Sequence, residues 1–409
     1  MVAFTAAQIP GIAGRTYPPE LAGPLYPNGI PILDEKLLPQ LVDELGVELV
    51  VLSYSDLTYE EVMEKASQAL ALGADFMLLG PKSTMLKSSR KVVAVTATKT
   101  GAGKSTVSRY VVRFLRQMGL KPVVVRHPMP YGVLEKQAVQ RFERLEDLEH
   151  YRCTVEEREE FEPHLRMGTV VYAGVDYGEV VRRAGEEADV IVWDGGNNDF
   201  PFLAPDLHIT VVDATRSTSQ FKTYPGKVNL LMADVVVINK ADKAERQQLD
   251  ELSKAVQSIN PHAEIVYTAS QLFVENVEGL KGRRVCVVED GPTVTHGGLS
   301  VGAAYTAAVS AGAIVVNPKP HAVGAIKQAY LDYPHLGPVV PAIGYTQSQL
   351  KDLEETLGRV DCDAIISSSP ADLTHLIEVK KPVHRVWFEA VETGGRSLLD
   401  ILRAFGIGR

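Results

Sequence analysis

The chain has 409 residues, of which 45% are hydrophobic and 23% charged, and its formal net charge is −9. This length allows two or three domains with their own cores, and the acidic balance argues against nucleic-acid partners while leaving room for a local basic pocket. Three widely spaced cysteines, no apolar run of membrane length and no signal-peptide pattern predict a soluble, cytoplasmic protein without a membrane partner.

The first 90 residues alternate strand-like and helix-like patterns and predict a small Rossmann-like α/β domain at residues 1–90. Strands are expected at residues 2–6, 48–54 and 75–79, and helices at residues 35–45 and 58–72. Thr58 as N-cap and Glu61 three residues later mark the start of the second helix. Arg15 stands in a glycine- and proline-rich loop, which is either functional or structural.

A phosphate-binding turn follows an apolar, β-branched strand at residues 91–96 and precedes an amphipathic helix at residues 105–118. Glycines let successive N–H groups converge on an anion, and the helix N-terminus adds its positive end. The nucleotide-binding residues are Thr100, Gly101, Ala102, Gly103, Lys104, Ser105 and Thr106. We expect Lys104 to reach the β- and γ-phosphates of ATP or GTP and Ser105 to bind Mg²⁺, with a chance glycine turn as the alternative.

A second lysine, Lys99, lies inside this loop, and Thr98 stands where the usual P-loop has glycine. The pattern resembles the deviant P-loop of SIMIBI-class NTPases, in which this lysine typically reaches a nucleotide across a dimer interface. The resemblance implies that Lys99 is catalytic in trans and that the protein is a homodimer.

Two further strands end in residues suited to phosphate chemistry. The strand at residues 122–125 runs into Arg126 and His127, where an open parallel sheet binds ligands, so both are candidates for catalysis and for contact with a substrate phosphate. A solvated surface turn is the alternative. The strand at residues 190–194 ends in Asp194, a Walker B carboxylate expected to hold Mg²⁺ directly or through water. The charged stretch at residues 141–162 is interpreted as a solvated helix face.

A possible base-recognition motif, Asn239, Lys240 and Asp242, follows a strand at residues 235–238. It resembles the Asn-Lys-x-Asp motif of GTPases, whose carboxylate accepts hydrogen bonds from guanine. Residues 91–279 are therefore predicted to form a central P-loop NTPase domain with a mostly parallel sheet.

The remaining residues, 280–409, predict a C-terminal α/β domain. Strands are expected at residues 283–288, 313–316, 339–342 and 364–367, and helices at residues 323–333 and 347–359. A loop at residues 289–298 contains acids, threonines, His296 and two glycines. It is either a ligand loop, with His296 as a substrate contact, or an ordinary turn.

Five stretches together resemble the cyclic 2,3-diphosphoglycerate synthetases and relatives often labelled GTPases: residues 6–15, 17–23, 125–132, 192–201 and 289–298. The resemblance covers nearly the whole chain. Members commonly open with an extra strand and a glycine turn before the strand equivalent to residues 2–6, so we expect that piece to be missing here.

The resemblance implies closure of a phosphoanhydride between the two phosphates of 2,3-bisphosphoglycerate, driven by ATP or GTP with Mg²⁺. Such phosphoryl transfer requires both charged molecules to be neutralised and aligned. Lys99 and Lys104 would serve the nucleotide; Arg126, His127 and either Arg15 or His296 would serve the acceptor. The alternative is a SIMIBI-type GTPase acting as a regulatory or chaperone protein. The guanine motif favours this alternative, whereas the loop at residues 126–132 and the flanking domains favour the synthetase.

Overall fold

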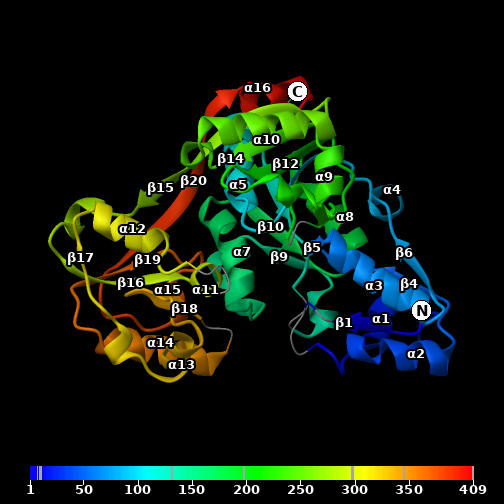
Figure 1. Cartoon of the computed structure of the whole chain (residues 1–409), viewed down its shortest axis with the longest axis horizontal. Coiled ribbons are helices and arrows are strands. Elements are labelled where there is room, and N and C mark those ends of the chain that lie inside the picture. The colour runs from blue at the N-terminus through cyan, green and yellow to red at the C-terminus, as the bar shows by residue number, and fades with distance from the viewer. Residues whose placement is uncertain are drawn as a thin grey trace. The chain divides into compact units, whose positions relative to one another are not determined.

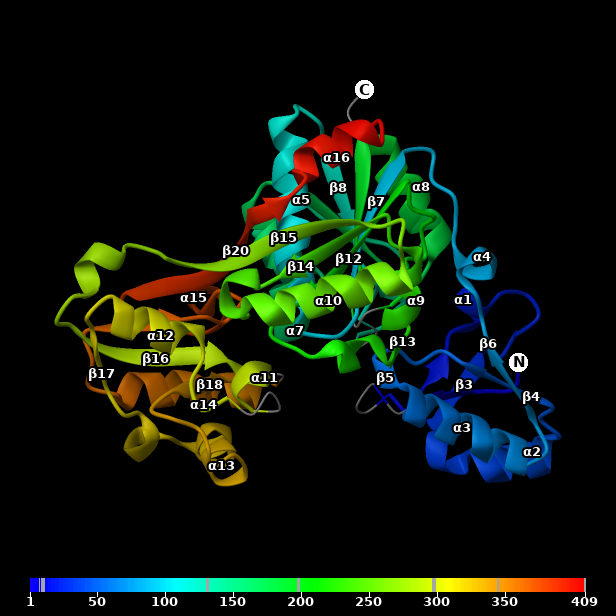
Figure 2. The ribbon, with the colours of Figure 1, turned by 45° about the horizontal axis from the view of Figure 1, so that its top comes forward.

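The computed structural model describes residues 1–6, 8, 12–129, 132–196, 199–295, 299–343 and 346–407. Contacts divide the chain into two compact units (Figures 1 and 2). Unit 1 comprises Met1–Glu143, Gly168–Ser270 and Ala390–Arg409, and unit 2 comprises Arg144–Met167 and Gln271–Glu389. The three-domain division stays a prediction, since the contacts group residues 1–90 with the phosphate loop. Within the described ranges, no helix is long and apolar enough to cross a membrane.

The central sheet of unit 1 has the strand order β9-β10-β8-β11-β7-β12-β14-β15, and all its pairs are parallel except β9 with β10. Its strands are β7 (Lys91–Ala97), β8 (Pro122–Val125), β9 (Gln140–Phe142), β10 (Val170–Ala173), β11 (Val190–Asp194), β12 (Leu207–Asp213), β14 (Val235–Asn239) and β15 (Glu264–Val274). Strand β7 therefore lies between β11 and β12, and the three carboxyl ends open at one edge.

Amphipathic helices cover this sheet because valine-rich strands buried on both faces need apolar partners on both sides. Helix α8 packs on β8, β10 and β11, helix α9 on β7 and β12, and helix α5 on β7, β8, β11 and β12. The regular elements are α5 (Lys104–Gln117), α8 (Tyr177–Glu187), α9 (Gly226–Met232), α10 (Arg246–Ile259), α16 (Leu398–Ala404), η2 (Leu134–Gln137), η3 (Thr218–Phe221) and η4 (Ala241–Lys243). The strand and helix predicted around the phosphate loop are confirmed.

The first 90 residues of unit 1 form two small sheets, β1-β3-β2 and β4-β6, and strand β5 pairs with β13 (Thr223–Tyr224). The elements are β1 (Phe4–Ala6), β2 (Thr16–Tyr17), α1 (Pro19–Ala22), β3 (Ile30–Asp34), η1 (Glu35–Leu37), α2 (Leu38–Leu45), β4 (Leu49–Leu52), β5 (Leu57–Thr58), α3 (Tyr59–Ala71), β6 (Asp75–Leu78) and α4 (Pro81–Thr84). Thr58 and Glu61 form the predicted capping box of α3. The β3 strand was not predicted, because Pro31 interrupts its apolar run. The split into two sheets depends on which strands pair, and no single segment of sequence contains that information.

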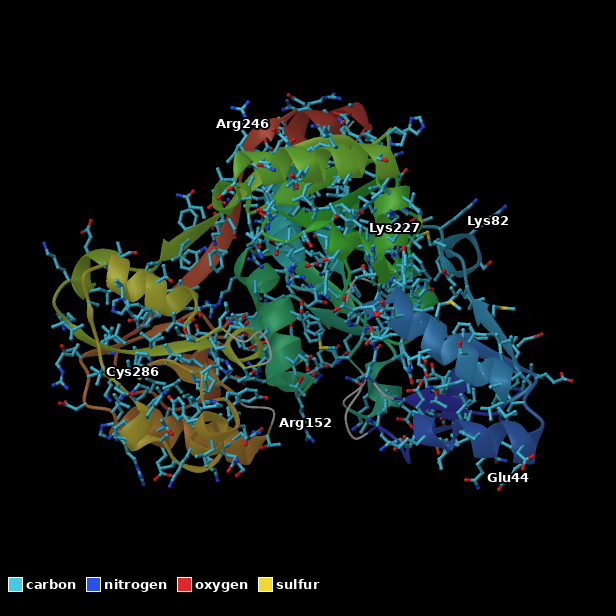
Figure 3. The ribbon with its side chains drawn as sticks, viewed as in Figure 1. Glu44, Lys82, Arg152, Lys227, Arg246 and Cys286 are labelled. Atoms are coloured by element: carbon cyan, nitrogen blue, oxygen red, sulfur yellow. The ribbon has the colours of Figure 1, made fainter. Side chains whose placement is uncertain are left out.

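Unit 2 contains a parallel sheet in the order β17-β16-β19-β20, with β18 also pairing with β16. Its elements are α6 (Leu145–His150), α7 (Val155–Arg166), η5 (Val277–Leu280), β16 (Arg284–Asp290), α11 (Gly291–Val294), α12 (Ala303–Ser310), β17 (Ile314–Val315), η6 (Lys319–His321), α13 (Gly324–Asp332), β18 (Val340–Ala342), α14 (Gln347–Arg359), β19 (Ala364–Ser367), α15 (Leu373–Leu376) and β20 (Val383–Gly395). Cys286, labelled in Figure 3, is buried on β16. Strands β15 and β20 each continue from one unit into the other.

The charged helix α7 is not the solvated face that its sequence indicates. Glu157 is only 3% exposed and Glu162 only 1% exposed. Glu162 accepts a hydrogen bond from Arg166 at 2.9 Å, and Arg166 also pairs with Asp372 of the same unit. Burial, together with the charge of Asp290, raises the pKa of Glu159 well above its ordinary value. The prediction was wrong because partners far away in sequence bury the charges.

Candidate nucleotide-binding site

The phosphate loop connects β7 to α5, whose first residue is Lys104. Gly101 and Gly103 have φ angles of +85° and +95°, in the left-handed region that favours glycine. A Cβ on Gly103 would lie 2.1 Å from Nδ2 of Asn239, so no other side chain fits there without moving Asn239. The buried Thr98 hydroxyl, at the position where glycine was expected, donates to Gln220 Oε1 at 3.1 Å.

One carboxylate and two cations meet at the carboxyl ends of β11 and β8. Lys104 Nζ donates to Asp194 Oδ1 at 2.8 Å, and an Arg126 terminal nitrogen donates to Asp194 Oδ2 at 2.6 Å. The exposed fractions of the three side chains are 11% for Lys104, 1% for Arg126 and 0% for Asp194. The structure thus joins three predicted site residues in one buried cluster.

One of these placements differs from the sequence interpretation. The Walker B carboxylate holds Lys104 largely buried beside the loop in which it was predicted to act. Arg126 was expected to contact an acceptor phosphate, yet its guanidinium lies against Asp194. In this structure Arg126 therefore positions the carboxylate, and a direct contact with an acceptor stays a prediction.

His127 lies beside the loop that follows β11. Its Nδ1 is 2.8 Å from the backbone nitrogen of Gly196 and 3.1 Å from Asp199 Oδ2. The two contacts exclude each other, because Nδ1 accepts from Gly196 only without a proton and donates to Asp199 only with one. Burial raises the pKa of the Asp199 carboxyl, but the hydrogen bond and charge of His127 outweigh it, so the net pKa is lowered.

Arg15 and His296 were the other two residues predicted to contact the acceptor. Arg15 donates to the carbonyl oxygen of Gly132 at 2.5 Å, which joins the first glycine-rich loop to the loop that follows β8. His296 lies outside the described residues. In the same predicted ligand loop, Glu289 accepts hydrogen bonds from the backbone of Gly302, Ala304 and Tyr305 and so caps helix α12.

Two of the three predicted base-recognition residues contact the phosphate loop directly. Asn239 Nδ2 donates to the carbonyl oxygen of Ala102 at 2.9 Å, and Lys240 Nζ donates to that of Gly101 at 2.8 Å. Asp242, which would accept from a purine base, is exposed, and its Oδ1 accepts from the backbone of Ser270 at 3.1 Å. Thr268 also supports the site by donating to Asn239 Oδ1 at 2.9 Å.

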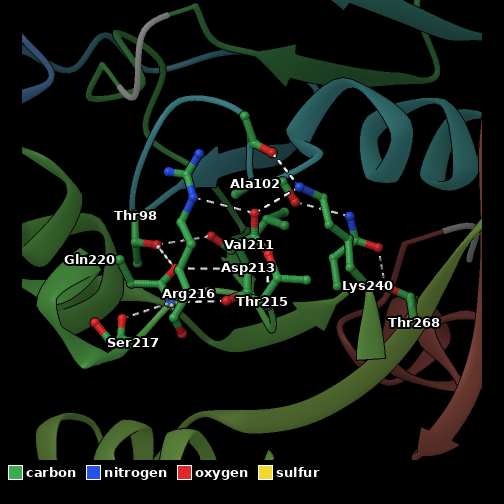
Figure 4. Close-up of polar contacts among 12 residues, drawn as sticks. Thr98, Ala102, Val211, Asp213, Thr215, Arg216, Ser217, Gln220, Lys240 and Thr268 are labelled. Atoms are coloured by element: carbon green, nitrogen blue, oxygen red, sulfur yellow. Dashed lines mark hydrogen bonds and ion pairs between the residues drawn. The ribbon is translucent and has the colours of Figure 1, made fainter. Parts of the chain in front are cut away.

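Asp213 at the end of β12 was missed as a site residue. It accepts from Lys240 Nζ at 2.7 Å and lies 3.5 Å from Arg216 Nε, and Figure 4 shows both side chains directed at it. Burial opposes its charge, but the hydrogen bonds of Lys240 and Thr215 outweigh this and lower the pKa of the carboxyl. A strand that ends in aspartate, as β11 also does, was the signal that would have found it.

The donors available for Mg²⁺ agree in type with the predicted site. Ser105 supplies a hydroxyl and Asp194 a carboxylate, and Mg²⁺ prefers such oxygen ligands completed by phosphate and water. Asp194 already balances two cations, so a direct contact requires Lys104 to move to the phosphates. Throughout the described ranges, no group of three or more His, Cys, Asp or Glu side chains is suited to holding a metal alone.

A parallel sheet with a glycine loop before a helix and a carboxylate on the adjacent strand defines a P-loop NTPase. A family model described as the cyclic 2,3-diphosphoglycerate synthetase P-loop domain matches residues 166–269. The chain is 53% identical over 403 residues to arginine synthetase ArcE of Thermococcus kodakarensis, covering 98% of this chain and 90% of the relative. The chain belongs to the cyclic 2,3-diphosphoglycerate synthetase family.

More distant relatives match part of the chain. A cyclic 2,3-diphosphoglycerate synthetase of Thermococcus sibiricus is 27% identical over 240 residues, or 54% of each chain. The chain also resembles a solved structure of LpxK from Aquifex aeolicus in complex with ATP, with a TM-score of 0.51 and 12% identity over 85% of this chain and 94% of that one. At this identity the likeness shows the fold alone.

Proposed function

We propose that the protein is a nucleoside-triphosphate-dependent synthetase that forms arginine. The proposal rests on the Lys104–Asp194–Arg126 cluster behind the phosphate loop, together with similarity along almost the full chain to a relative named arginine synthetase. The cluster places positive charge where a γ-phosphate would lie. The name of the relative suggests arginine as the product. Cyclisation of 2,3-bisphosphoglycerate is the second candidate, and the family model and the partial matches favour it.

One chemical scheme accommodates both candidates. An acceptor oxygen attacks the γ-phosphorus, the bond to the nucleoside diphosphate breaks, and a second nucleophile then displaces the new phosphate from the activated acceptor. For arginine, the acceptor would be the ureido oxygen of citrulline and the second nucleophile ammonia, so that the products are arginine, nucleoside diphosphate and phosphate. For the cyclic product, a neighbouring phosphate of the same molecule would be the second nucleophile.

Each residue of the site would have a separate role in the proposed phosphoryl transfer. Lys104 would neutralise the β- and γ-phosphates, and Arg126 would balance the charge of Asp194 and orient its carboxylate. Ser105 and Asp194 would hold Mg²⁺, which supplies charge neutralisation on the phosphates when bound. His127, with Asp199 beside it, is the group of this site suited to moving a proton from the second nucleophile.

The direct test is a set of reactions with ATP or GTP and Mg²⁺, in which phosphate release and products are measured. The arms are citrulline with ammonium, 2,3-bisphosphoglycerate, and nucleotide alone. We expect arginine and acceptor-stimulated phosphate release in the first arm. Stimulation only by 2,3-bisphosphoglycerate would identify the second candidate, and hydrolysis that no acceptor changes would favour a regulatory GTPase. Removing Mg²⁺ with EDTA should abolish all turnover.

The nucleotide preference and the homodimer are part of the proposal. Asn239, Lys240 and Asp242 favour guanine, so GTP should support turnover at least as well as ATP. Lys99 is proposed to act on a nucleotide held by a second copy of the chain. Sedimentation should therefore show a dimer with nucleotide bound, and a mixture of Lys99→Ala and Lys104→Ala chains should be more active than either variant alone. A monomer whose activity per subunit is independent of dilution would disprove this.

A further inference from the structure

A polar pocket of about 360 Å³ lies beside the phosphate loop in unit 1. Its lining residues are Lys99, Arg216, Ser217, Ser219 and Gln220. A terminal nitrogen of Arg216 lies 3.1 Å from the position that a Cβ on Gly101 would occupy. The guanidinium is therefore packed against the backbone of the phosphate loop itself.

The pocket has an excess of positive charge. Arg216 pairs only with Asp213, through Nε at 3.5 Å, and no other described residue bonds its two terminal nitrogens. Asp213 is already balanced by Lys240 at 2.7 Å. The side-chain ammonium of Lys99 makes no hydrogen bond or ion pair with any residue in the described ranges. Two hydrogen bonds with Thr58 are the main cause that lowers the pKa of Glu61, and the charge of Lys99 lowers it further. Two cations thus face one cavity without a full set of partners.

Gln220 fixes the shape of this pocket. Its side chain, 3% exposed, donates to the carbonyl oxygen of Asp213 at 2.9 Å and accepts from the Asp213 backbone at 3.0 Å and from Thr98 at 3.1 Å (Figure 4). The same amide group contacts the carbonyl oxygens of Arg216 and Ser217, each at 3.3 Å. A buried amide satisfied in this way holds the Arg216 loop against the phosphate loop.

We propose that this pocket binds an oxyanion, phosphate or carboxylate, with Arg216 as its principal ligand. A guanidinium with both terminal nitrogens available suits two oxygens of one anion. The hydroxyls of Ser217 and Ser219, which lie 2.8 Å apart, supply a further donor. The anion belongs either to the nucleotide or to the acceptor of the proposed synthetase. Only the second source rests on the proposed function.

The test compares the parent protein with Arg216→Ala and Arg216→Lys. Nucleotide affinity is measured by titration calorimetry, and inorganic phosphate is then titrated into protein saturated with Mg²⁺ and nucleoside diphosphate. We expect Arg216→Ala to weaken one of these affinities on the order of tenfold, and Arg216→Lys to recover only part of it because an ammonium lacks the planar fork. The affected binding should also depend less on salt in Arg216→Ala.

Lys82→Ala is the matched control, because it removes one positive charge from helix α4 of the same unit, where the side chain points away from the helix into solvent (Figure 3). A weakened nucleotide affinity assigns the pocket to the nucleotide. Unchanged nucleotide affinity with weakened phosphate binding and a raised KM for the acceptor assigns it to the acceptor. Equal affinities for both probes in the parent and Arg216→Ala would overturn the proposal. Both titrations measure binding and can be carried out even if no acceptor stimulates turnover. Failure of the proposed function can therefore be distinguished from failure of the proposed anion site.

Discussion

Lys104→Met should lower nucleotide turnover by about a thousandfold or more, because it removes the charge that the phosphate-loop motif places at the β- and γ-phosphates. Such a loss corresponds to about 4 kcal/mol of transition-state stabilisation. Methionine keeps most of the buried stem while removing the charge. Phosphate release under saturating nucleotide is the measurement.

The control for this prediction is the thermal stability of the Lys104→Met variant compared with that of the parent protein. Asp194 keeps Arg126 as a partner when Lys104 is replaced, so thermal unfolding of the variant should shift far less than its activity. Lys104→Arg retains a charge but not the compact ammonium, and it should also be impaired. Turnover close to the parent rate in Lys104→Met would refute the assignment of the phosphate loop.

Replacing Arg126 should have the largest effect on stability. Its guanidinium is 1% exposed and bonds a carboxylate that is fully buried, so Arg126→Ala removes one cationic partner from a buried charge. Breaking a buried pair by removing one member costs about 3–5 kcal/mol. Denaturant unfolding of the purified variant would show the loss, and turnover should fall with it because Asp194 is no longer held in place.

A second variant separates charge balance from lost packing. Asp194→Asn added to Arg126→Ala removes the unbalanced carboxylate, so the double variant should be more stable than Arg126→Ala alone while remaining inactive. If the two single losses in unfolding free energy simply add, the ion pair is not what stabilises this region.

The sequence was sufficient to predict elements whose own residues determine them. Strands β8, β11 and β19 and helix α14 begin and end at the expected residues, because apolar runs or a clear helical period stop at polar or turn-forming residues. The phosphate loop was predicted because its glycine spacing and the helix that follows are local features that together form an anion-binding turn. Strands β15 and β20 were not predicted, since much of each is half-exposed and lacks a continuous apolar run.

The sequence predicted which residues belong to the candidate site better than it predicted how their side chains are arranged. Lys104, Asp194 and Arg126 each follow a strand, so their meeting at one sheet edge could be expected from topology. Whether a cation faces solvent or a carboxylate depends on which strands are neighbours, and no single segment contains that information. Arg216 and Gln220 belong to no motif, and only the close approach of their loop to the phosphate loop reveals them.

The contact between Gly103 and Asn239 limits which substitutions this chain can accept at either position. Any side chain at position 103 would overlap the Asn239 amide, and that amide bonds the neighbouring carbonyl oxygen of Ala102. Replacing Asn239 to change the proposed base specificity would therefore remove a support of the phosphate loop in the same step. Gly103 has its own requirement for glycine, because its φ is +95°. A library randomised at both positions should therefore retain glycine at position 103, whichever residue stands at position 239.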